Sequence, residues 1–541
     1  MSRTARRPRP LALASAALAL LTLTACGAAG SADATGTATG PVDGGTLTFA
    51  LANDPISLNP QGGGSGNDAY YVNRQLVDSL VDQDPATGEI VPWLATDWEV
   101  SADSTTFTFT LRDGVTFSDG TAFTAASVRN TLDDVVAQGA KANWAVSYVA
   151  GYVSTEVRDA HTAVVTFDRP NIGFLQALAG PFLAPLADAT LALPFEERAT
   201  SIIGTGPFVL DSYAPDQEVV LTAREDYAWG SGLRENDAAP HLDGVVFRIV
   251  PEASVRTGAL QSDQVDVIGG VPPTDQAHLE DAGFPLVLRA NPGTTFGLQP
   301  YTEQPIVSEE PVRQAIGLAL DRQELRDTVL TEDFAVSTSV LSSTTPTWVD
   351  LSAHLGHDLA RAVDLLEGAG WVEGPDGVRE RDGERLRLTL AWQPNFVANQ
   401  ATVELVQQQL RAAGIEIELV SGTVPEVNEG EASGRYDLRF GNFSRSDGDV
   451  LRTQFHSELG RPYTAPDAEL DALLAAQAAE RDPAARAELL ARAQEHILTR
   501  ALYIPTFELT SILGTQQDVH GLSLGADSRL APLTDAYVAG D

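Results

Sequence analysis

The side chains that usually perform catalysis are present in this 541-residue chain, but their spacing matches no catalytic motif. There is no Gly-x-Ser-x-Gly elbow, no His-Glu-x-x-His pair and no phosphate-binding loop, and Cys26 is the only cysteine. The glycine-rich run at residues 62–66 does not join a clear strand to a clear helix. The histidines are scattered, with only His354 and His357 close together. We therefore expect no enzyme activity, no metal site and no cofactor.

The most informative local stretch for binding chemistry covers residues 436–449, with the sequence Tyr-Asp-Leu-Arg-Phe-Gly-Asn-Phe-Ser-Arg-Ser-Asp-Gly-Asp. It places an aromatic ring, a guanidinium group and carboxylates within a few positions of one another. A guanidinium group binds carboxylates through two parallel hydrogen bonds. Arg445 can therefore hold an anionic group of a ligand, or it can form a salt bridge to Asp447 or Asp449, and the sequence leaves both open.

The strands that must position such residues are recognised by their alternation of apolar and polar side chains. Residues 46–51 and 106–111 alternate as half-buried strands do. The second runs into Asp113-Gly114, a turn pair that predicts a hairpin. Further strands are expected at residues 164–167, 245–250, 265–268, 386–392 and 415–420.

Helices are interleaved with these strands, and several have recognisable ends. Ser308 is expected to cap a helix, and the helix at residues 358–369 is expected to end at Gly370. Two Ala/Leu-rich helices are expected at residues 467–480 and 483–498, the second capped by Asp482. Strands and helices alternate without a repeat period, so the predicted class is α/β.

The N-terminus resembles an export signal. Arginines precede a short apolar run at residues 11–23, and this run is shorter than the about 20 residues that a membrane-spanning helix needs. Leu23-Thr24-Ala25-Cys26 resembles the lipobox of bacterial lipoproteins, although an ordinary signal peptide is the alternative. We expect a signal peptide at residues 1–25, lipidation at Cys26, and a lipid-anchored flexible linker at residues 26–44.

The net charge of −39 argues against nucleic acid as a partner, because binding a polyanion needs a basic patch. Hydrophobic residues make up 43% of the chain and charged residues 20%, which is typical of a globular protein. After Cys26 no apolar run is long enough to cross a bilayer. We therefore expect contact with the membrane through the lipid anchor alone, and a folded part that is held together by packing.

Several spaced segments resemble bacterial extracytoplasmic solute-binding protein family 5, which includes the oligopeptide- and dipeptide-binding proteins and the nickel-binding proteins of ABC importers. The matches occur in order along the whole exported part of the chain. They lie at residues 92–101, 107–124, 204–208, 224–229, 312–316, 320–322, 369–371 and 376–378. Each can also be read as structural scaffolding, so together they indicate the fold and leave the ligand open.

The resemblance implies a two-lobed, periplasmic-binding-protein-like α/β fold of type II, in the large cluster with an extra subdomain. A hinge of two crossing segments joins the lobes and closes on a ligand. The expected boundaries are lobe I at residues 45–292 with the subdomain at about 80–200, lobe II at 293–503, and a return to lobe I at 504–541.

The same resemblance suggests the ligand-binding residues. In the family, an aromatic residue and an aspartate that pairs with a peptide amine follow a strand of the second lobe. Here Phe443 falls near the aromatic, and the aspartate position falls on Ser444 or Ser446, so the amine-binding acid is either shifted to Asp447 or absent. The candidate ligand-binding residues are Phe443, Arg445, Asp447, Asn442, Ser444, Trp392, Trp144 and Tyr71. For each single aromatic, packing in a core is the competing interpretation.

The expected function is capture of a peptide or peptide-like solute outside the cell membrane and its delivery, by hinge closure, to an ABC permease and its ATPase. We expect a monomer in the periplasmic space or cell envelope. The alternatives are a binder of metal chelates or siderophores, or a peptide-sensing surface lipoprotein without transport.

Overall fold

The protein is described from a computed structural model, which covers residues 40–62, 66–459 and 464–539. Residues 42–541 form one compact unit, and it is this unit that we describe. Cys26, the expected signal peptide and nearly all of the expected linker lie outside the described residues.

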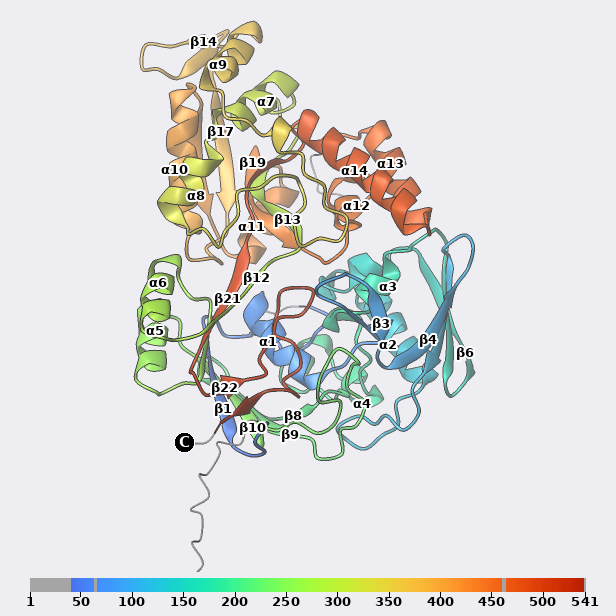
Figure 1. The fold of residues 1–541 in the computed structure, drawn as a ribbon. Coiled ribbons are helices and arrows are strands. Elements are labelled where there is room, and N and C mark those ends of the chain that lie inside the picture. Colours follow the sequence, from blue (N-terminus) through green and yellow to red (C-terminus); the bar gives the residue numbers. More distant parts are fainter. Residues whose placement is uncertain (1–39, 63–65, 460–463, 540–541) are drawn as a thin grey trace, which may run out of the picture. The chain divides into compact units, whose positions relative to one another are not determined.

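A seven-stranded mixed sheet forms the centre of what we call lobe I (Figure 1). Its central strand β1 pairs in parallel with β10 and β11, and the remaining neighbours pair antiparallel. The sheet order is β12 (Leu286–Ala290), β21 (Thr510–Thr515), β11 (Val267–Gly269), β1 (Thr46–Leu51), β10 (Gly244–Ile249), β9 (Glu218–Ala223) and β8 (Phe208–Ala214). The strand predicted at residues 46–51 is confirmed with the same bounds.

Helices and short pairings complete this part of lobe I. The longer helices are α1 (Asn67–Leu76), α5 (Ala253–Gln261) and α6 (Pro273–Asp281). A two-stranded hairpin is formed by β2 (Val81–Gln83) and β3 (Ile90–Pro92), and a second pair by β22 (Val519–His520) and β23 (Tyr537–Val538). Almost every residue of α1 is buried, so this helix lies inside the lobe and can present side chains to an internal cavity.

A four-stranded antiparallel sheet with its own hydrophobic core lies within the region expected to be the extra subdomain. Its order is β4 (Ala95–Val100), β5 (Thr106–Leu111), β7 (Thr162–Phe167) and β6 (Tyr152–Asp159). Helix α2 (Ala125–Gln138) packs against it. The shorter helices of this region are η1 (Gly139–Lys141), η2 (Val146–Val149), α3 (Phe174–Ala177), η3 (Pro181–Leu183), α4 (Asp188–Leu191) and η4 (Phe195–Thr200).

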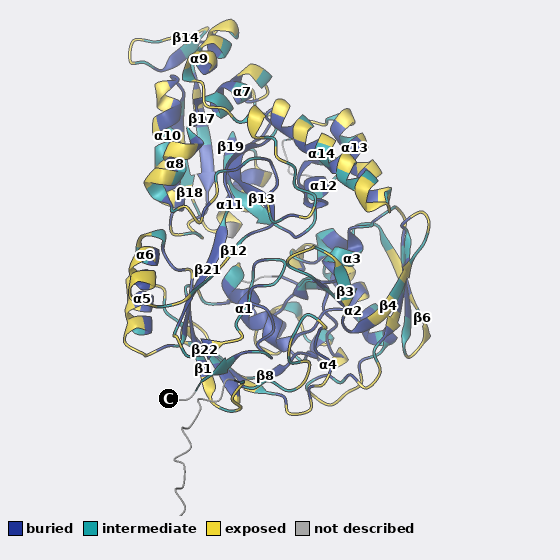
Figure 2. Ribbon diagram, viewed as in Figure 1, coloured by how far each residue is buried: buried dark blue, intermediate teal, exposed yellow. Residues whose placement is uncertain are grey.

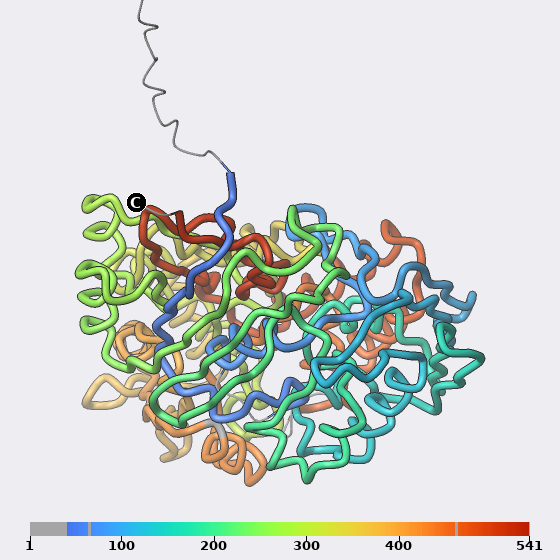
Figure 3. The backbone as a smooth tube through the Cα atoms, turned by 90° about the horizontal axis from the view of Figure 1, so that it is seen from below, coloured from blue at the N-terminus to red at the C-terminus, as the bar shows by residue number. Residues whose placement is uncertain are grey.

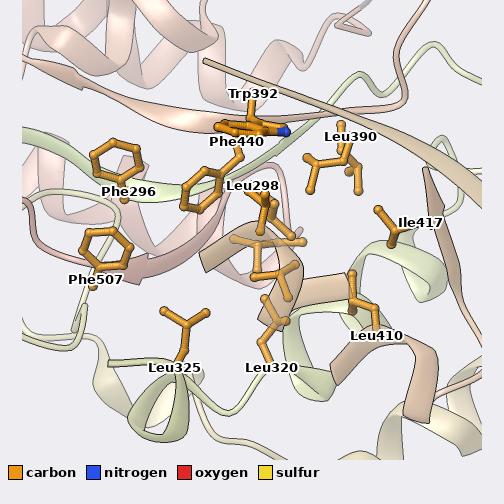
Figure 4. Close-up of a cluster of buried hydrophobic side chains, with 14 of the residues drawn as sticks. Phe296, Leu298, Leu320, Leu325, Leu390, Trp392, Leu410, Ile417, Phe440 and Phe507 are labelled. Atoms are coloured by element: carbon orange, nitrogen blue, oxygen red, sulfur yellow. The ribbon is translucent and has the colours of Figure 1, made fainter. Parts of the chain in front are cut away.

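A five-stranded sheet forms the centre of what we call lobe II, in the order β18 (Glu416–Ser421), β17 (Arg387–Trp392), β19 (Leu438–Ser444), β13 (Gly293–Pro300) and β20 (Ile504–Phe507). Its helices are α7 (Glu310–Ala319), α8 (Arg322–Val329), α9 (Leu359–Gly368), α10 (Asn399–Ala412) and α11 (Val424–Ala432), with η5 (Ser352–His354). Buried side chains of β13, β17, β19 and β20 pack with those of α8 and α10 in one core (Figure 4). In α10, Val403, Val406 and Leu410 lie on one face, which explains why this sequence forms a helix against the sheet.

A group of three helices, α12 (Val450–Phe455), α13 (Ala468–Ala479) and α14 (Pro483–Thr499), covers another part of lobe II with a separate apolar cluster. Exposed residues gather on the outer faces of α13 and α14 (Figure 2). The predicted cap at Asp482 is confirmed, because its carboxylate accepts from the backbone N–H of Ala485 at 2.9 Å. The structure also shows a cap at Asp467, whose carboxylate accepts from the backbone N–H of Leu470 at 3.1 Å.

Two short connections join the sheets of the two lobes. One lies at residues 291–292 between β12 and β13, and the other at residues 508–509 between β20 and β21. The backbone N–H of Asn291 donates to the carbonyl of Leu509 at 2.6 Å, so the two connections lie side by side. Since β20 belongs to the sheet of lobe II, the chain returns to lobe I slightly later than the expected boundary at residue 504.

Two local predictions are wrong. Strand β5 does not form a hairpin through Asp113-Gly114, because its partners are β4 and β7, and the chain after this turn forms only the isolated bridge Thr116↔Ala122. The helix expected to be capped by Ser308 has Glu309 at its N-cap instead, while the Ser308 hydroxyl donates to the Pro305 carbonyl.

The two ends of the described chain lie on the same side of lobe I (Figure 3). Asp43 is within 2.6 Å of the ring of His241, and Tyr537 packs against the same ring edge to face. The first residues of the compact unit therefore lie beside the C-terminal segment.

Candidate functional site

A cavity of about 660 Å³, counted out to its open mouth, lies where the end of β19 meets lobe I. Lobe II contributes Ser444, Arg445 and Ser446 to the lining. Lobe I contributes residues of α1, β2, η2, α3 and η3 together with the C-terminal segment 525–532. These segments are far apart in the sequence, so tertiary folding brings the cavity together.

Arg445 is buried at the lobe II side of this cavity, with 4% of its surface exposed. Its guanidinium group lies 4.0 Å over the ring of Tyr148. Nη1 is 3.7 Å from Asp449, and Nη2 donates to the Ser147 hydroxyl at 3.4 Å. Its Nε is buried and has no hydrogen-bond partner among the described residues. An unmet buried donor costs about 1–3 kcal/mol, so this Nε atom would gain from an acceptor.

The two aspartates that follow Arg445 are paired mainly with other arginines. Arg452 donates to both oxygens of Asp449, at 2.7 and 2.9 Å. Arg486 donates to both oxygens of Asp447, at 2.9 and 2.5 Å. Burial alone raises the pKa of Asp449, but Arg452 and Arg445 outweigh this effect and hold it below its ordinary value. Three arginines thus share two carboxylates, and the positive charge left over is at the cavity.

The end of β19 is tied to lobe I through Ser446. The amide of Gln83 donates to the Ser446 carbonyl at 3.0 Å, and that of Gln176 donates to the Ser446 hydroxyl at 2.9 Å. Deeper in the same interface, Arg452 of lobe II donates to Asn171 of lobe I at 2.9 Å. The structure therefore has the two lobes in contact on one side of the cavity.

Aromatic rings form a row at the lobe I side of the cavity, of which Tyr148 and Phe182 line the cavity itself. Tyr148 stacks on Phe182 with 5.5 Å between ring centroids, and Phe182 meets Tyr70 edge to face at 4.8 Å. The guanidinium of Arg529 lies 4.0 Å over Tyr70, as that of Arg445 does over Tyr148. The row offers an apolar surface with a cation over each of its end rings, which suits a ligand with an apolar body and a charged end.

The C-terminal segment carries charges that are already paired. Arg529 is 3.7 Å from Asp527 and donates to Asn67 at 3.0 Å. Arg234, which lines the same side, is 3.9 Å from Asp535. Because these side chains are paired, the side of the cavity formed by the C-terminal segment carries less uncompensated charge than the side at Arg445.

Asp78 lies fully buried behind the cavity. It accepts from the indole of Trp229 at 2.9 Å and from the hydroxyl of Tyr227 at 3.2 Å. Burial raises its pKa to about 7, although these donors and the charge of Arg74 act in the opposite direction. Arg74 also lines the cavity, so Asp78 is electrostatically linked to the site.

Two kinds of feature are absent from the described residues. None of the helices among them has the length and apolar character needed to cross a bilayer. In the same part of the chain, no three His, Cys, Asp or Glu side chains gather in a way that could hold a metal ion.

Comparison with known proteins shows the family. The model of bacterial extracellular solute-binding proteins, family 5 Middle, matches residues 89–456, which is more than half of the chain. The chain belongs to this family.

Curated relatives of this solute-binding protein differ in what their names say they bind. The nickel-binding periplasmic protein of Escherichia coli is 26% identical over 420 residues, covering 73% of this chain and 76% of the relative. The probable di/tripeptide-binding protein 5 of Pseudomonas aeruginosa is 28% identical over 485 residues, covering 84% and 88%.

Solved structures confirm the predicted two-lobed binding-protein fold. NikA from Brucella suis in complex with Fe(III)-EDTA has a TM-score of 0.78 at 24% identity, covering 91% of this chain and 100% of that one. DppA from Helicobacter pylori in complex with the peptide STSA has a TM-score of 0.76 at 22% identity, covering 92% and 99%.

Of the expected binding residues of this solute-binding protein, Ser444 and Arg445 line the cavity. Trp144 lies behind its aromatic row, stacked on Tyr70 at 5.1 Å. Asp447 does not line the cavity and is engaged by Arg486.

The other expected residues lie elsewhere. Phe443 packs against the apolar cluster of α12, α13 and α14, and Asn442 lines a smaller cavity of about 280 Å³ within lobe II. Trp392 lies in the core of lobe II beside Phe440 and Leu390 (Figure 4). Tyr71 packs against Phe49 in the core of lobe I. Their roles in ligand binding stay predictions.

Several residues at the cavity were not identified from the sequence, among them Asp82, Gln83, Tyr148, Gln176 and Arg529. None of them stands in a distinctive motif. Tyr148 could have been found as a second aromatic one helical turn after Trp144, whereas the others are brought to the cavity only by tertiary contacts.

Proposed function

We propose that this protein captures a peptide or peptide-like solute outside the cell membrane and delivers it to an ABC permease that is driven by a cytoplasmic ATPase. The observation that carries the proposal is the buried, partly unsatisfied guanidinium of Arg445 in a cavity between the two lobes. The names of relatives that bind dipeptides and tripeptides add support.

In this proposal Arg445 binds the carboxylate of the solute. Its Nε lacks a partner in the described part of the chain, and Asp449 is shared with Arg452, so a ligand carboxylate supplies both an acceptor and a compensating charge. The body of the solute packs on Tyr148 and Phe182. Specificity for side chains is then loose, because stacking on rings does not select one side chain.

Closure of the lobes completes the site. Ser446 is held by Gln83 and Gln176 across the interface, and a movement that opens the lobes breaks these hydrogen bonds. A ligand that contacts Arg445 on one side and Tyr148 on the other favours the closed form through its differential affinity. The permease then recognises the closed form.

The N-terminal segment is the part of the chain that would determine where the protein is located. We propose that lipidated Cys26 anchors the protein to the outer face of the cell membrane and that the residues between Cys26 and the compact unit act as a flexible tether. We also propose that the folded part works as a monomer.

A second candidate ligand is a metal chelate, because one relative is named a nickel-binding periplasmic protein. A chelate that carries its own carboxylates would use the same arginine. The two candidates differ in whether metal accompanies the bound solute.

The test is native mass spectrometry and metal analysis of the full-length protein isolated from the cells that make it. The proposal expects an organic solute that carries a carboxylate, in a ratio of one per chain and without metal. An equimolar metal ion with the solute would favour the chelate, and a protein that binds no peptide from a broad panel would contradict the proposal.

A further inference from the structure

We infer that Asp449 is a positioning residue that joins Arg445 to a latch between the two lobes, outside the ligand cavity. The latch consists of the contacts that Ser104, Asn171 and Ile172 of lobe I make with Arg452 and the end of α13 in lobe II. The inference rests on the proposed function, because it names the contacts that hold the lobes closed and the residue that links them to the cavity.

The C-terminal end of helix α13 is capped by lobe I. The last carbonyls of a helix have no partner within the helix and need donors from elsewhere. The backbone N–H of Ile172 donates to the Ala478 carbonyl at 3.0 Å, and the Ser104 hydroxyl donates to the Ala479 carbonyl at 3.3 Å. Both donors belong to lobe I and both acceptors to lobe II, so a movement that separates the lobes breaks both hydrogen bonds.

Asp449 is buried where α12, α13 and lobe I meet. Besides its two hydrogen bonds from Arg452, its carboxylate accepts from the amide of Gln477 in α13 at 2.6 Å. Gly173 of lobe I packs directly on it, since a Cβ atom built at this glycine would lie 3.1 Å from the carboxyl carbon of Asp449. The carboxylate therefore contacts the latch helix and the opposite lobe at once.

The contacts of Asp449 form a closed circuit that crosses the lobe interface twice. Arg452 donates to the side-chain oxygen of Asn171 at 2.9 Å, and the Asn171 amide donates to the Tyr148 carbonyl at 3.1 Å. The guanidinium of Arg445 lies 4.0 Å over the Tyr148 ring and 3.7 Å from Asp449. The circuit thus joins the arginine at the cavity to the asparagine of the latch through hydrogen bonds and charges.

Burial makes the members of this circuit depend on one another. Asn171, Asp449 and Arg452 each have 5% or less of their surface exposed. Removing one partner from such a group leaves the others uncompensated in a medium that water does not reach. In the proposed function a solute contacts both Arg445 and Tyr148, so it stabilises the same circuit.

Hydrogen exchange of the ligand-free, full-length protein tests the latch. The Ile172 amide exchanges only when its hydrogen bond to Ala478 opens, and overlapping peptides in mass spectrometry isolate it. Asp449→Asn keeps the size of the side chain and removes its charge, so this amide should exchange at least about tenfold faster. Amides in strands β5 and β17 should keep their wild-type rates, which shows that the effect is local.

A second variant tests the latch without disturbing a charge. Ser104→Ala removes one of the two donors that cap α13, and the Ile172 amide should then exchange about two- to tenfold faster. Ser212→Ala, at an exposed serine of β8, is the matched control and should leave the rate unchanged.

The link to the cavity is tested by a double-variant cycle in the same experiment. Arg445→Gln should also speed exchange at Ile172, because Asp449 loses a partner and Tyr148 loses its cation. Combining Arg445→Gln with Asp449→Asn should give less than the product of the two separate effects, since both act through one circuit. Asp364→Asn, at an exposed position of α9, should exchange like the wild type.

The outcomes distinguish the latch from the proposed function. A folded Asp449→Asn or Ser104→Ala protein with the wild-type rate at Ile172 would overturn the latch. A wild-type rate in Arg445→Gln, or effects that multiply independently, would overturn the positioning role of Asp449. None of these rates requires a ligand, so a protein that binds no dipeptide would contradict the proposed function while the exchange data still decide the latch.

Discussion

At the scale of single residues, the cavity is defined by charges that the protein itself leaves partly uncompensated. Arg445 shares Asp449 with Arg452 and has a buried Nε without a partner in the described structure. Buried charges are normally paired because desolvation is costly. An arginine kept in this state at a cavity wall is most simply explained by a ligand that completes its hydrogen bonds.

Replacing Arg445 tests this explanation. Arg445→Gln should weaken binding of a carboxylate-bearing solute about ten- to a hundredfold, since a hydrogen-bonded ion pair with the ligand is lost. Arg492→Gln, an exposed arginine of α14, is the control and should bind normally. Titration calorimetry with the copurified solute measures both, and equal affinity of both variants would remove Arg445 from the site.

Asp78 gives a pH-dependent prediction. Because folding raises its pKa from 3.8 to about 7, the folded state binds more protons than the unfolded state between these values, and stability falls as pH rises through this window. Asp78→Asn keeps an acceptor for Trp229 and removes the charge, so the slope should drop by up to about 1.4 kcal/mol per pH unit.

Urea denaturation across this pH range measures the effect. The exposed Asp97 provides the control variant, Asp97→Asn, which should leave the slope unchanged. Part of the slope should remain in Asp78→Asn, because burial also raises the pKa of Asp68 to about 6. An unaltered slope in Asp78→Asn would contradict the assignment.

At the scale of elements, the pairing of β13 with β19 positions Arg445. Gly293 begins β13 with a φ of 103°, and a Cβ atom built there would lie 2.6 Å from the backbone nitrogen of Arg445 and closer still to the carbonyl of Phe443. Only glycine has room in this conformation and at this approach. The glycine thus fixes the direction in which the end of β19 enters the cavity.

Gly293→Ala should therefore affect both stability and binding. We expect a loss of about 1–3 kcal/mol in the free energy of unfolding, from backbone strain, and weaker ligand binding because the end of β19 is displaced. Gly317→Ala is the control, since its Cβ would be 3.8 Å from Ile504 inside helix α7, and it should gain up to about 1 kcal/mol. Chemical denaturation and titration of both variants decide the point, and a Gly293→Ala protein with wild-type affinity would contradict it.

Local sequence signals predicted helices and strands well where the interactions that fix them join residues close together in the chain. The alternation at residues 46–51 and the cap at Asp482 appear in the structure as β1 and the start of α14. The hairpin after β5 was wrong because the partner of a strand is chosen by tertiary packing, and a turn pair reports only the local backbone.

The dependence on tertiary packing also limits what the sequence predicts about the candidate binding site. Arg445 could be identified because it stands in a run of aromatic and charged residues. Asp82, Gln176 and Arg529 could not, since each comes from a different segment and meets the others only after folding. Trp392 and Tyr71 show the converse, because aromatic residues at strand ends and near loops are also the ones that fill cores.

At the scale of the whole molecule, the fold places one cavity wall on each lobe and joins the lobes by two adjacent connections. In the proposed function, this arrangement allows ligand binding to select one relative position of the lobes. A net charge of −39 disfavours electrostatic attraction to anionic surfaces, which agrees with the proposed attachment to the membrane through a lipid at Cys26.

The proposed lipid anchor at Cys26 leads to a separate prediction. If the proposed lipidation is correct, Cys26→Ser should move the protein from the membrane fraction to the soluble fraction, because the thiol proposed to carry the lipid is removed, and ligand affinity should be unchanged. Fractionation of cells and titration of the released protein measure the two properties. A Cys26→Ser protein that stays with the membrane would contradict lipidation at this residue.

The most direct test of the central claim is a crystal structure of the full-length protein grown with the solute that copurifies with it or with a dipeptide that it binds. The account predicts the ligand in the cavity of about 660 Å³, with a carboxylate oxygen within hydrogen-bond distance of Nε or Nη of Arg445 and its body against Tyr148. A ligand bound elsewhere, or one in this cavity with no contact to Arg445, would contradict it.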